Sequence, residues 1–185
     1  GCPFSDMIRS EAVPMVRLTE IFRQAQQSLI VMNAHRVNHG EPPELTAKDR
    51  DFFFLRRRAE EAAAQTIVEL VAQRLPKNMG IPASEIQVLS PTRKGGCGTA
   101  RLNELLQAAL NPPAPDKREK KSGEILFREG DKVMQIRNNY DILWKKTDGS
   151  ALGTGIFNGD IGVILDIDLN METVQIRFDD RITEY

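Results

Sequence analysis

The sequence predicts an α/β fold followed by a small module built only from strands. Up to about residue 111, segments with helical periodicity alternate with short apolar runs, which is typical of helices layered on a parallel sheet. After residue 123 the helical periodicity disappears, and short strand-like segments are separated by Gly, Asn and Asp turns. We therefore expect an α/β part over residues 1–111, a linker over 112–123 and a small antiparallel barrel or curled sheet over 124–185.

Four segments of the first part are expected to be helical. The longest, residues 59–75, is rich in Ala, Glu and Leu and carries an apolar stripe along one face. Pro76 is expected to end that helix, and Thr99 is expected to cap the helix at 99–111. The two remaining helices are predicted over 3–10 and 28–39.

Short apolar runs between these helices are expected to supply the strands of the parallel sheet. They lie at 14–18, 51–57 and 85–91. The stretch "PPAPDKREKKSG" at 112–123 is Pro-rich and then charged, which favours a linker or mobile loop.

The composition excludes several classes of protein. The 185 residues carry a net charge of −1, so a nucleic-acid site has to come from a local patch. Cys2 and Cys97 match no metal spacing, which favours a reduced, cytoplasmic protein. We find no run of 18 apolar residues and no signal-peptide pattern, so we expect no membrane partner. The unusual ends, Gly1 without a methionine and Tyr185 within a strand-like segment, lead us to expect a segment of a longer protein.

The common catalytic motifs are missing from the sequence. GxxxxGK[ST], HExxH, CxxC and GxSxG do not occur, so no ATP phosphate loop is present. His35 and His39 are spaced to share a metal ion on one helix face, but no third ligand is evident. Solvated or capping histidines near a helix C-terminus explain the pair without a metal, and we predict no metal site.

Arg23, in the stretch "RLTEIFRQA", is the first candidate for a functional charge. Its guanidinium is a permanent charge with a planar fork that suits phosphate oxygens. A surface ion pair with Glu20 is the alternative, and composition alone favours it.

A second candidate is the loop "SPTRKGG" at 90–96, between a predicted strand and a predicted helix. Ligands of α/β sheets bind at the carboxyl ends of strands, where such loops lie. An ordinary flexible connection is the alternative. The candidate phosphate contacts are Thr92, Arg93, Lys94 and the amides of Gly95 and Gly96.

The β module offers two further signals. Asn158-Gly159 is a strong hairpin-turn signal, and a purely structural turn explains it. Aromatic side chains lie near basic ones in this module, which suits stacking on single-stranded bases, although core packing of a small barrel is the alternative. These residues are Tyr140, Trp144 and Phe157, with Arg137, Lys145 and Lys146.

Long stretches of the chain resemble, in order, the RecD-type helicases of superfamily 1, which include exodeoxyribonuclease V alpha subunits and RecD/TraA-like helicases. They are "VPMVRLTEIFRQAQQSLIVMNAHRVNHG" (13–40), "VLSPTRKGGCGTARLNELLQAALNPP" (88–113) and "FREGDKVMQIRNNYD" with "GIFNGDIGVI" (127–164). The resemblance implies that residues 1–111 hold the first half of the second RecA-like domain. It also implies that residues 124–185 form an SH3-like β module inserted in that domain.

The resemblance implies a motor that binds ATP and Mg between two RecA-like domains and moves 5′ to 3′ on single-stranded DNA. Arg23 matches the catalytic arginine that contacts the ATP γ-phosphate in similar enzymes. The Walker A and Walker B segments would precede Gly1, so this chain alone is not expected to hold ATP or to hydrolyse it. The DNA-track residues implied are Thr92, Arg93, Lys94 and, as a secondary role, Asn158.

The partners implied are single-stranded DNA and duplex junctions, together with RecB/RecC-like subunits, in DNA repair and recombination. A non-catalytic module that docks a protein or DNA is the alternative function. A Pif1-like or conjugative-relaxase helicase is a third, because the "NGxxG" turn is shared beyond RecD-type enzymes.

Overall fold

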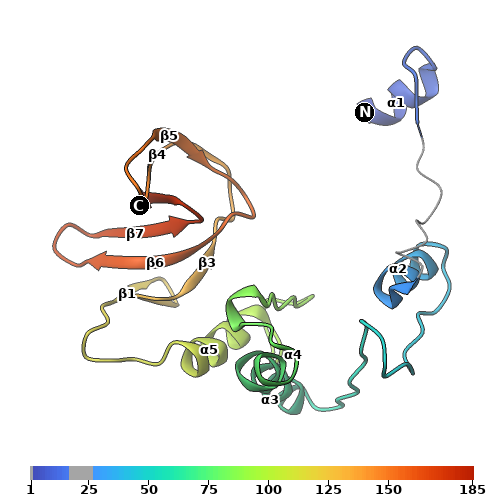
Figure 1. Ribbon diagram of the computed structural model, residues 1–185, viewed down its shortest axis with the longest axis horizontal. Helices are drawn as coiled ribbons and strands as arrows, with labels where there is room; N and C mark the ends of the chain where they lie inside the picture. The colour runs from blue at the N-terminus through green and yellow to red at the C-terminus, as the bar shows by residue number, and fades with distance from the viewer. Residues whose placement is uncertain (1, 17–26) are drawn as a thin grey trace. The chain divides into compact units, whose positions relative to one another are not determined.

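The computed structural model describes residues 2–16 and 27–185 (Figure 1). The chain divides into two compact units, Gly1–Arg56 and Arg57–Tyr185. Each unit is described by itself below. Among the described residues, no helix is long and apolar enough to cross a membrane.

The first unit contains the helices α1 (Pro3–Ser10) and α2 (Leu29–Asn38), close to the two that the sequence predicts there. Ser28 caps α2, since its hydroxyl oxygen accepts a hydrogen bond from the Val31 amide. The Asp51 carboxylate accepts a second one from the Leu29 amide at 2.7 Å, which places a negative charge at the positive end of the helix.

The second unit begins with a helix that does not stop where the sequence predicts. After α3 (Glu60–Glu69) the chain widens into the π-type turn η2 (Leu70–Arg74) and continues as α4 (Leu75–Met79). The prediction that Pro76 ends the helix is therefore wrong. Proline has no amide to donate and its ring crowds the carbonyl four residues back, and the wider turn before Pro76 accommodates both effects.

The parallel sheet expected in the first 111 residues is not present in the described structure. Every strand pair found in residues 2–16 and 27–185 is antiparallel and lies after residue 118. Residues 52–57 and 86–90 are extended but form no ladder, and residues 83–85 form the short 3-10 helix η3 (Ala83–Glu85). A strand needs a neighbour for its amides and carbonyls, and no described segment supplies one. The RecA-like half therefore stays a prediction.

The predicted β module is present and takes in the strands β3 to β8 (Figure 1). They form a six-stranded antiparallel sheet in the order β3-β6-β7-β8-β4-β5. The strands are β3 (Lys132–Met134), β4 (Asn139–Lys146), β5 (Leu152–Ile156), β6 (Ile161–Asp168), β7 (Thr173–Phe178) and β8 (Arg181–Glu184).

Two glycines let the sheet close over its core. The core side chains Ile156, Ile164, Ile167 and Phe178 are almost fully buried. A Cβ added at Gly162 would lie 2.7 Å from Ile176 Cγ2, and one at Gly153 would lie 2.3 Å from Trp144 Cζ2. Such distances are not tolerated, so both positions need glycine for the sheet to pack this closely.

Part of the expected linker is an ordered hairpin. Strand β1 (Glu119–Ser122) pairs with β2 (Ile125–Arg128), with Glu119 opposite Arg128. The turn between them has Gly123 at a φ of +60°, a conformation that glycine adopts without strain. Residues 119–122 are therefore a strand, although their charge predicted a mobile connection.

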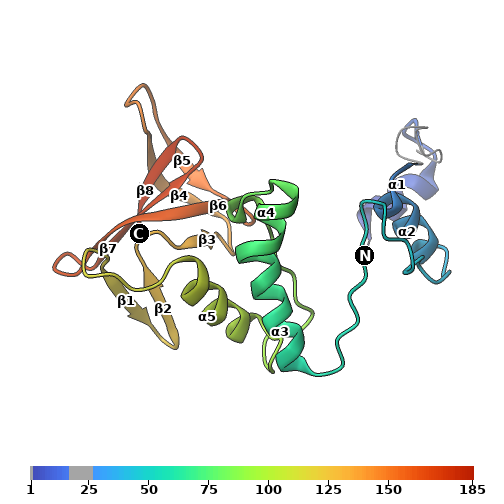
Figure 2. The same ribbon diagram turned by 60° about the horizontal axis from the view of Figure 1, so that its bottom comes forward.

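Helix α5 (Thr99–Leu110) joins the helical and the β parts of the second unit. It lies between α3 and the β1–β2 hairpin (Figure 2). Leu102 is its buried residue, which confirms the amphipathic helix predicted here. The helix begins at Thr99, so the N-cap position belongs to Gly98 rather than Thr99. A Cβ at residue 98 would lie 2.5 Å from the Lys94 carbonyl oxygen, so this position needs glycine.

Candidate nucleic-acid interface

The loop at residues 92–98 is folded tightly onto the start of α5. The Thr99 amide donates to the Thr92 carbonyl at 3.0 Å, and the Ala100 amide donates to the Arg93 carbonyl at 3.3 Å. The first amides of α5, which are commonly free at a helix N-terminus, are thus partly used by the loop itself. Ser90 adds a hydrogen bond from its hydroxyl to the Cys97 carbonyl at 2.7 Å.

The Gly96 amide, expected as a phosphate contact, already has an anionic partner. It donates to the Glu60 carboxylate at 2.6 Å, from the first turn of α3. Cys97 also donates its thiol to the Glu60 carbonyl oxygen. The expectation that this amide is open to phosphate is therefore corrected, and the side chains remain the loop's possible anion contacts.

Thr92, Arg93 and Lys94 are brought together on the exposed side of this loop. Within the described residues, neither the Arg93 guanidinium nor the Lys94 ammonium forms an ion pair. Two adjacent, solvent-facing cations without carboxylate partners are chemically suited to phosphate oxygens.

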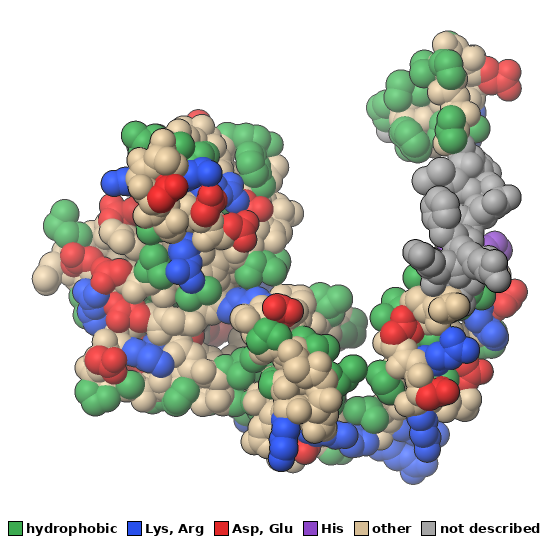
Figure 3. Space-filling model, in the orientation of Figure 1, with side chains coloured by type: hydrophobic (Ala, Val, Ile, Leu, Met, Phe, Trp, Pro, Cys, Tyr) green, Lys and Arg blue, Asp and Glu red, His purple; other side chains and the backbone are tan. Residues whose placement is uncertain are grey.

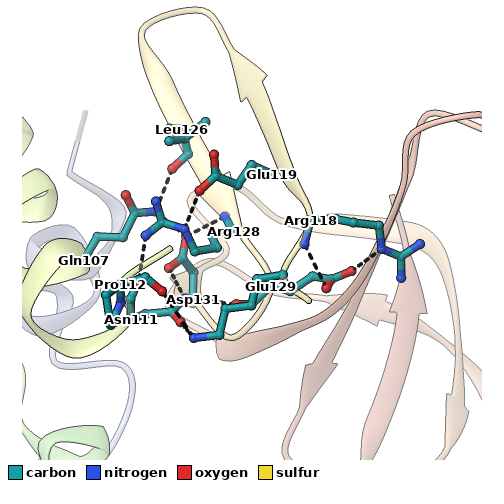
Figure 4. Close-up of polar contacts among 10 residues, drawn as sticks. Gln107, Asn111, Pro112, Arg118, Glu119, Leu126, Arg128, Glu129 and Asp131 are labelled. Carbon is teal, nitrogen blue, oxygen red and sulfur yellow. Dashed lines mark hydrogen bonds and ion pairs between the residues drawn. The ribbon is translucent and has the colours of Figure 1, made fainter. Parts of the chain in front are cut away.

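The far end of α5 is held by a buried polar cluster that we call the Asn111 network, made of Gln107, Asn111, Arg128 and Asp131 (Figure 4). Asn111 is 8% exposed, and its side-chain amide donates to the Glu129 carbonyl at 3.0 Å and to Asp131 at 2.7 Å. Its backbone carbonyl accepts from the Arg128 guanidinium at 2.5 Å. The network therefore binds α5 to β2 and to the turn before β3.

Three further contacts belong to this network. Gln107 donates to Asp131 at 2.6 Å and to the Leu126 carbonyl at 2.8 Å. The Arg128 guanidinium, 6% exposed, forms an ion pair with Glu119 at 2.6 Å across the hairpin. A buried arginine is tolerated only when its donors are satisfied, and these partners satisfy it.

Glu129 connects the hairpin to the six-stranded sheet. Its carboxylate accepts hydrogen bonds from the amides of Arg118 (3.1 Å) and Ile167 (3.0 Å), and the Arg118 guanidinium lies 2.7 Å away. Burial by itself would raise the pKa of Glu129, but these donors outweigh it and hold the pKa below its usual value.

The aromatic residues of the β module separate into two groups. Trp144 packs over Gly153, and the Arg181 guanidinium lies 6.0 Å from its ring centroid, so it serves the interior of the sheet. Tyr140 and Phe157 are instead exposed at the surface, at 64% and 42%. Lys146 is occupied by an ion pair with Asp180 at 2.9 Å.

Asn158 lies in a turn, as the sequence predicts. The Asp160 amide donates to the Phe157 carbonyl at 3.0 Å, and Gly159 takes a φ of +96°. This turn is not a hairpin, because β5 and β6 are not neighbours in the sheet. No hydrogen bond or ion pair within the described part of the chain joins Asn158 to the loop at 92–98.

Two other sequence candidates need a brief account. Arg23 lies outside the described residues. His39 lies with its ring nitrogen Nδ1 2.7 Å from the His35 carbonyl oxygen, which is a capping contact at the end of α2. Residues 2–16 and 27–185 hold no group of side chains placed to bind a metal.

Sequence reasoning missed the residues that position the candidate surfaces. The network residues lie in stretches that we interpreted only as helix or strand, and no motif marks them. The one local signal is Gly130 between Glu129 and Asp131, which indicates a turn. A Cβ at Gly130 would lie 3.2 Å from the Asn111 side-chain oxygen, so this glycine makes room for the network.

Comparison with known proteins gives two matches. Residues 102–178 match the family model described as the SH3 domain of ATP-dependent RecD-like DNA helicases. The chain is also 32% identical over 175 residues to the ATP-dependent RecD2 DNA helicase of Deinococcus radiodurans. That alignment takes in 95% of this chain and 21% of the relative, so the chain spans about a fifth of that protein's length.

We predict that Asn111→Ala destabilises the second unit by about 2–3 kcal/mol, because Asp131 loses a donor in a partly buried position. Urea unfolding followed by the fluorescence of Trp144, the single tryptophan, measures this change. Asn170→Ala, in the exposed β6–β7 turn, is the matched control and should cost no more than about 0.5 kcal/mol. Equal stability of the two variants would contradict the role of the network.

We predict an acid-dependent loss of stability that depends on Glu129. Because its pKa is lowered on folding, its contribution is fully present above the unfolded-state pKa of about 4.3 and is lost as the pH falls through the folded-state value. Urea unfolding between pH 7 and pH 3 should show a smaller decline for Glu129→Gln than for the unaltered chain. Glu124→Gln, exposed in the β1–β2 turn, should leave the decline unchanged.

Proposed function

We propose that this chain is part of a RecD-like DNA helicase, and that it contributes part of the single-stranded DNA track to an ATP-dependent 5′–3′ helicase that acts in DNA repair and recombination. The observation that carries this proposal is that Arg93 and Lys94 are exposed and form no ion pair within the described part of the chain, on a loop held by its own hydrogen bonds. In this role the two cations bind successive phosphates and read no sequence.

The charge distribution favours the loop at residues 92–98, rather than the β module, as the part that attracts DNA phosphates. Over residues 124–185 acidic side chains outnumber basic ones, so the β module as a whole does not attract the DNA backbone. The loop at residues 92–98 therefore supplies the main electrostatic contact in this proposal, with Thr92 as a hydroxyl donor beside the two cations. Asn158 has a secondary role, since its side chain is exposed while its backbone amide donates to the Asn138 side-chain oxygen.

ATP hydrolysis is proposed for the full-length protein that contains this chain, and not for the chain alone. We place ATP and Mg in a cleft to which this chain adds one group, the Arg23 guanidinium, directed at the γ-phosphate. Arginine suits that position because its charge is permanent and its fork matches phosphate oxygens. Single-stranded DNA and duplex junctions are the proposed partners, and RecB/RecC-like subunits stay an expectation drawn from the resemblance.

The DNA-track role is tested with Arg93→Ala in the 185-residue chain. Binding of a fluorescein-labelled oligo(dT) should weaken, and the slope of log K against log salt should fall by about 0.7 for the lost phosphate contact. Arg101→Ala is the matched control, because Arg101 is equally charged, lies on α5 and is paired with Glu104 at 3.2 Å. If both substitutions change the salt slope equally, the loop has no special part in DNA binding.

The Arg23 role is tested in the full-length protein that contains this chain. Arg23→Ala should lower ATP hydrolysis about 1,000-fold or more, the range found for arginine fingers, and should leave oligo(dT) binding intact. Arg17→Ala, six residues earlier in the same stretch, is the control and should hydrolyse ATP normally. Loss of DNA binding with ATP hydrolysis retained would assign Arg23 to the DNA instead.

A further inference from the structure

Two aromatic rings form an edge-to-face pair on the surface of the β module. Tyr140 lies near the start of β4, and Phe157 directly follows β5. Their ring centroids are 5.6 Å apart with an angle of 68° between the planes, the edge-to-face arrangement that aromatic pairs prefer. Tyr140 is nevertheless 64% exposed, so most of this residue stays accessible to a ligand.

The backbone around Tyr140 is irregular in a way that directs it outward. The register between β4 and β5 shifts between Asn139 and Leu143, and such shifts commonly re-aim a side chain. On the other strand, Gly155 has a φ of +96°, and a Cβ there would lie 3.0 Å from Phe157 Cζ. Glycine at 155 therefore allows the Phe157 ring to fold back and support Tyr140.

Asn138 fixes this surface with hydrogen bonds on both sides. Its amide nitrogen donates to the Tyr140 hydroxyl at 3.0 Å, and its amide oxygen accepts from the Asn158 backbone at 2.9 Å. One side chain thus holds the tyrosine and the β5–β6 turn together. Because Tyr140 accepts this hydrogen bond, its own hydroxyl proton stays available to a ligand.

An exposed cation, Arg137, lies three residues before Tyr140 in the chain. Arg137 is exposed, and within the described residues its guanidinium forms no ion pair. Two other cations of the module, Lys146 and Arg181, are by contrast paired with Asp180 and Asp160. The surface therefore combines a pre-set aromatic face with one free positive charge.

We propose that the Tyr140 ring, supported by Phe157, stacks on an unpaired base of single-stranded DNA while Arg137 contacts a neighbouring phosphate. The inference rests on the proposed DNA track and extends it from the loop at 92–98 to the β module. Stacking suits this site because it needs an exposed, rigid ring face and little positive charge.

The test compares oligo(dT) binding by the unaltered 185-residue chain and its variants. Tyr140→Leu keeps an apolar side chain but loses the ring, and we expect about tenfold weaker binding with an unchanged salt slope. Tyr140→Phe and Tyr140→Trp keep a stacking face and should bind within about twofold of the unaltered chain. Arg137→Ala should lower the salt slope by about 0.7.

Leu152→Ala is the matched control, because Leu152 is a 77% exposed apolar residue on neighbouring β5. It should not change DNA binding. Trp144 fluorescence confirms that each variant is folded, since that ring packs inside the same sheet. Irradiating the complex with an oligonucleotide that contains 5-iododeoxyuridine should give a cross-link to Tyr140, identified by mass spectrometry of the digested chain.

The outcomes separate this inference from the proposed function. If the unaltered chain binds oligo(dT) and Arg93→Ala weakens it, but Tyr140→Leu binds normally and no cross-link forms at Tyr140, only the stacking inference is overturned. If the unaltered chain binds no oligo(dT) at low salt, both fail. Equal weakening by Tyr140→Leu and Leu152→Ala would also overturn stacking, and would point to a general apolar surface of the kind that docks proteins.

Discussion

The attachment of helix α5 to the β module depends on the side chain of Asn111. Its side-chain nitrogen donates to Glu129 and Asp131 in the turn before β3, its side-chain oxygen accepts from Lys117, and Gly130 leaves the space that it needs. A buried polar group of this kind stabilises one arrangement because any other leaves donors or acceptors unsatisfied. The hydrogen bonds of the network therefore favour a single arrangement of helix α5, the hairpin and the turn before β3 (Figure 4).

Local elements were predictable from the sequence, whereas elements that need a distant partner were not. Helix 99–111 closes its hydrogen bonds within itself, so its periodicity and the following prolines were sufficient. The runs at 51–57 and 85–91 have strand-like composition, but composition does not supply the neighbouring strand. Residues 119–122 show the reverse case, since they were predicted as part of a linker and form a strand. Their pairing with 125–128 depends on Gly123 and on the Glu119–Arg128 ion pair rather than on an apolar pattern.

The candidate sites show the same limit at the level of side chains. Exposed cations in a short loop are readable from the sequence, and Arg93 and Lys94 are indeed exposed. The Gly96 amide is already bonded to Glu60, 36 residues earlier, and no local sequence signal indicates this tertiary contact.

Likewise, nothing in the sequence separates Trp144 from Tyr140. The separation comes from cross-strand geometry, because Gly153 lies opposite Trp144 and admits its ring to the interior. In the view of Figure 3, hydrophobic, basic and acidic side chains are intermixed over the β module.

Helix α5 has a mechanical consequence for the second unit. It is 12 residues long, about 18 Å, and it starts in the cationic loop and ends in the buried asparagine. A helix of this length is stiff along its axis, and neither end is attached through a flexible tether. If single-stranded DNA binds the loop at residues 92–98, as we propose, a force on that loop would be transmitted along α5 to the Asn111 network. The fixed end of α5 is then Asn111, where the chain leaves the helix toward the β module.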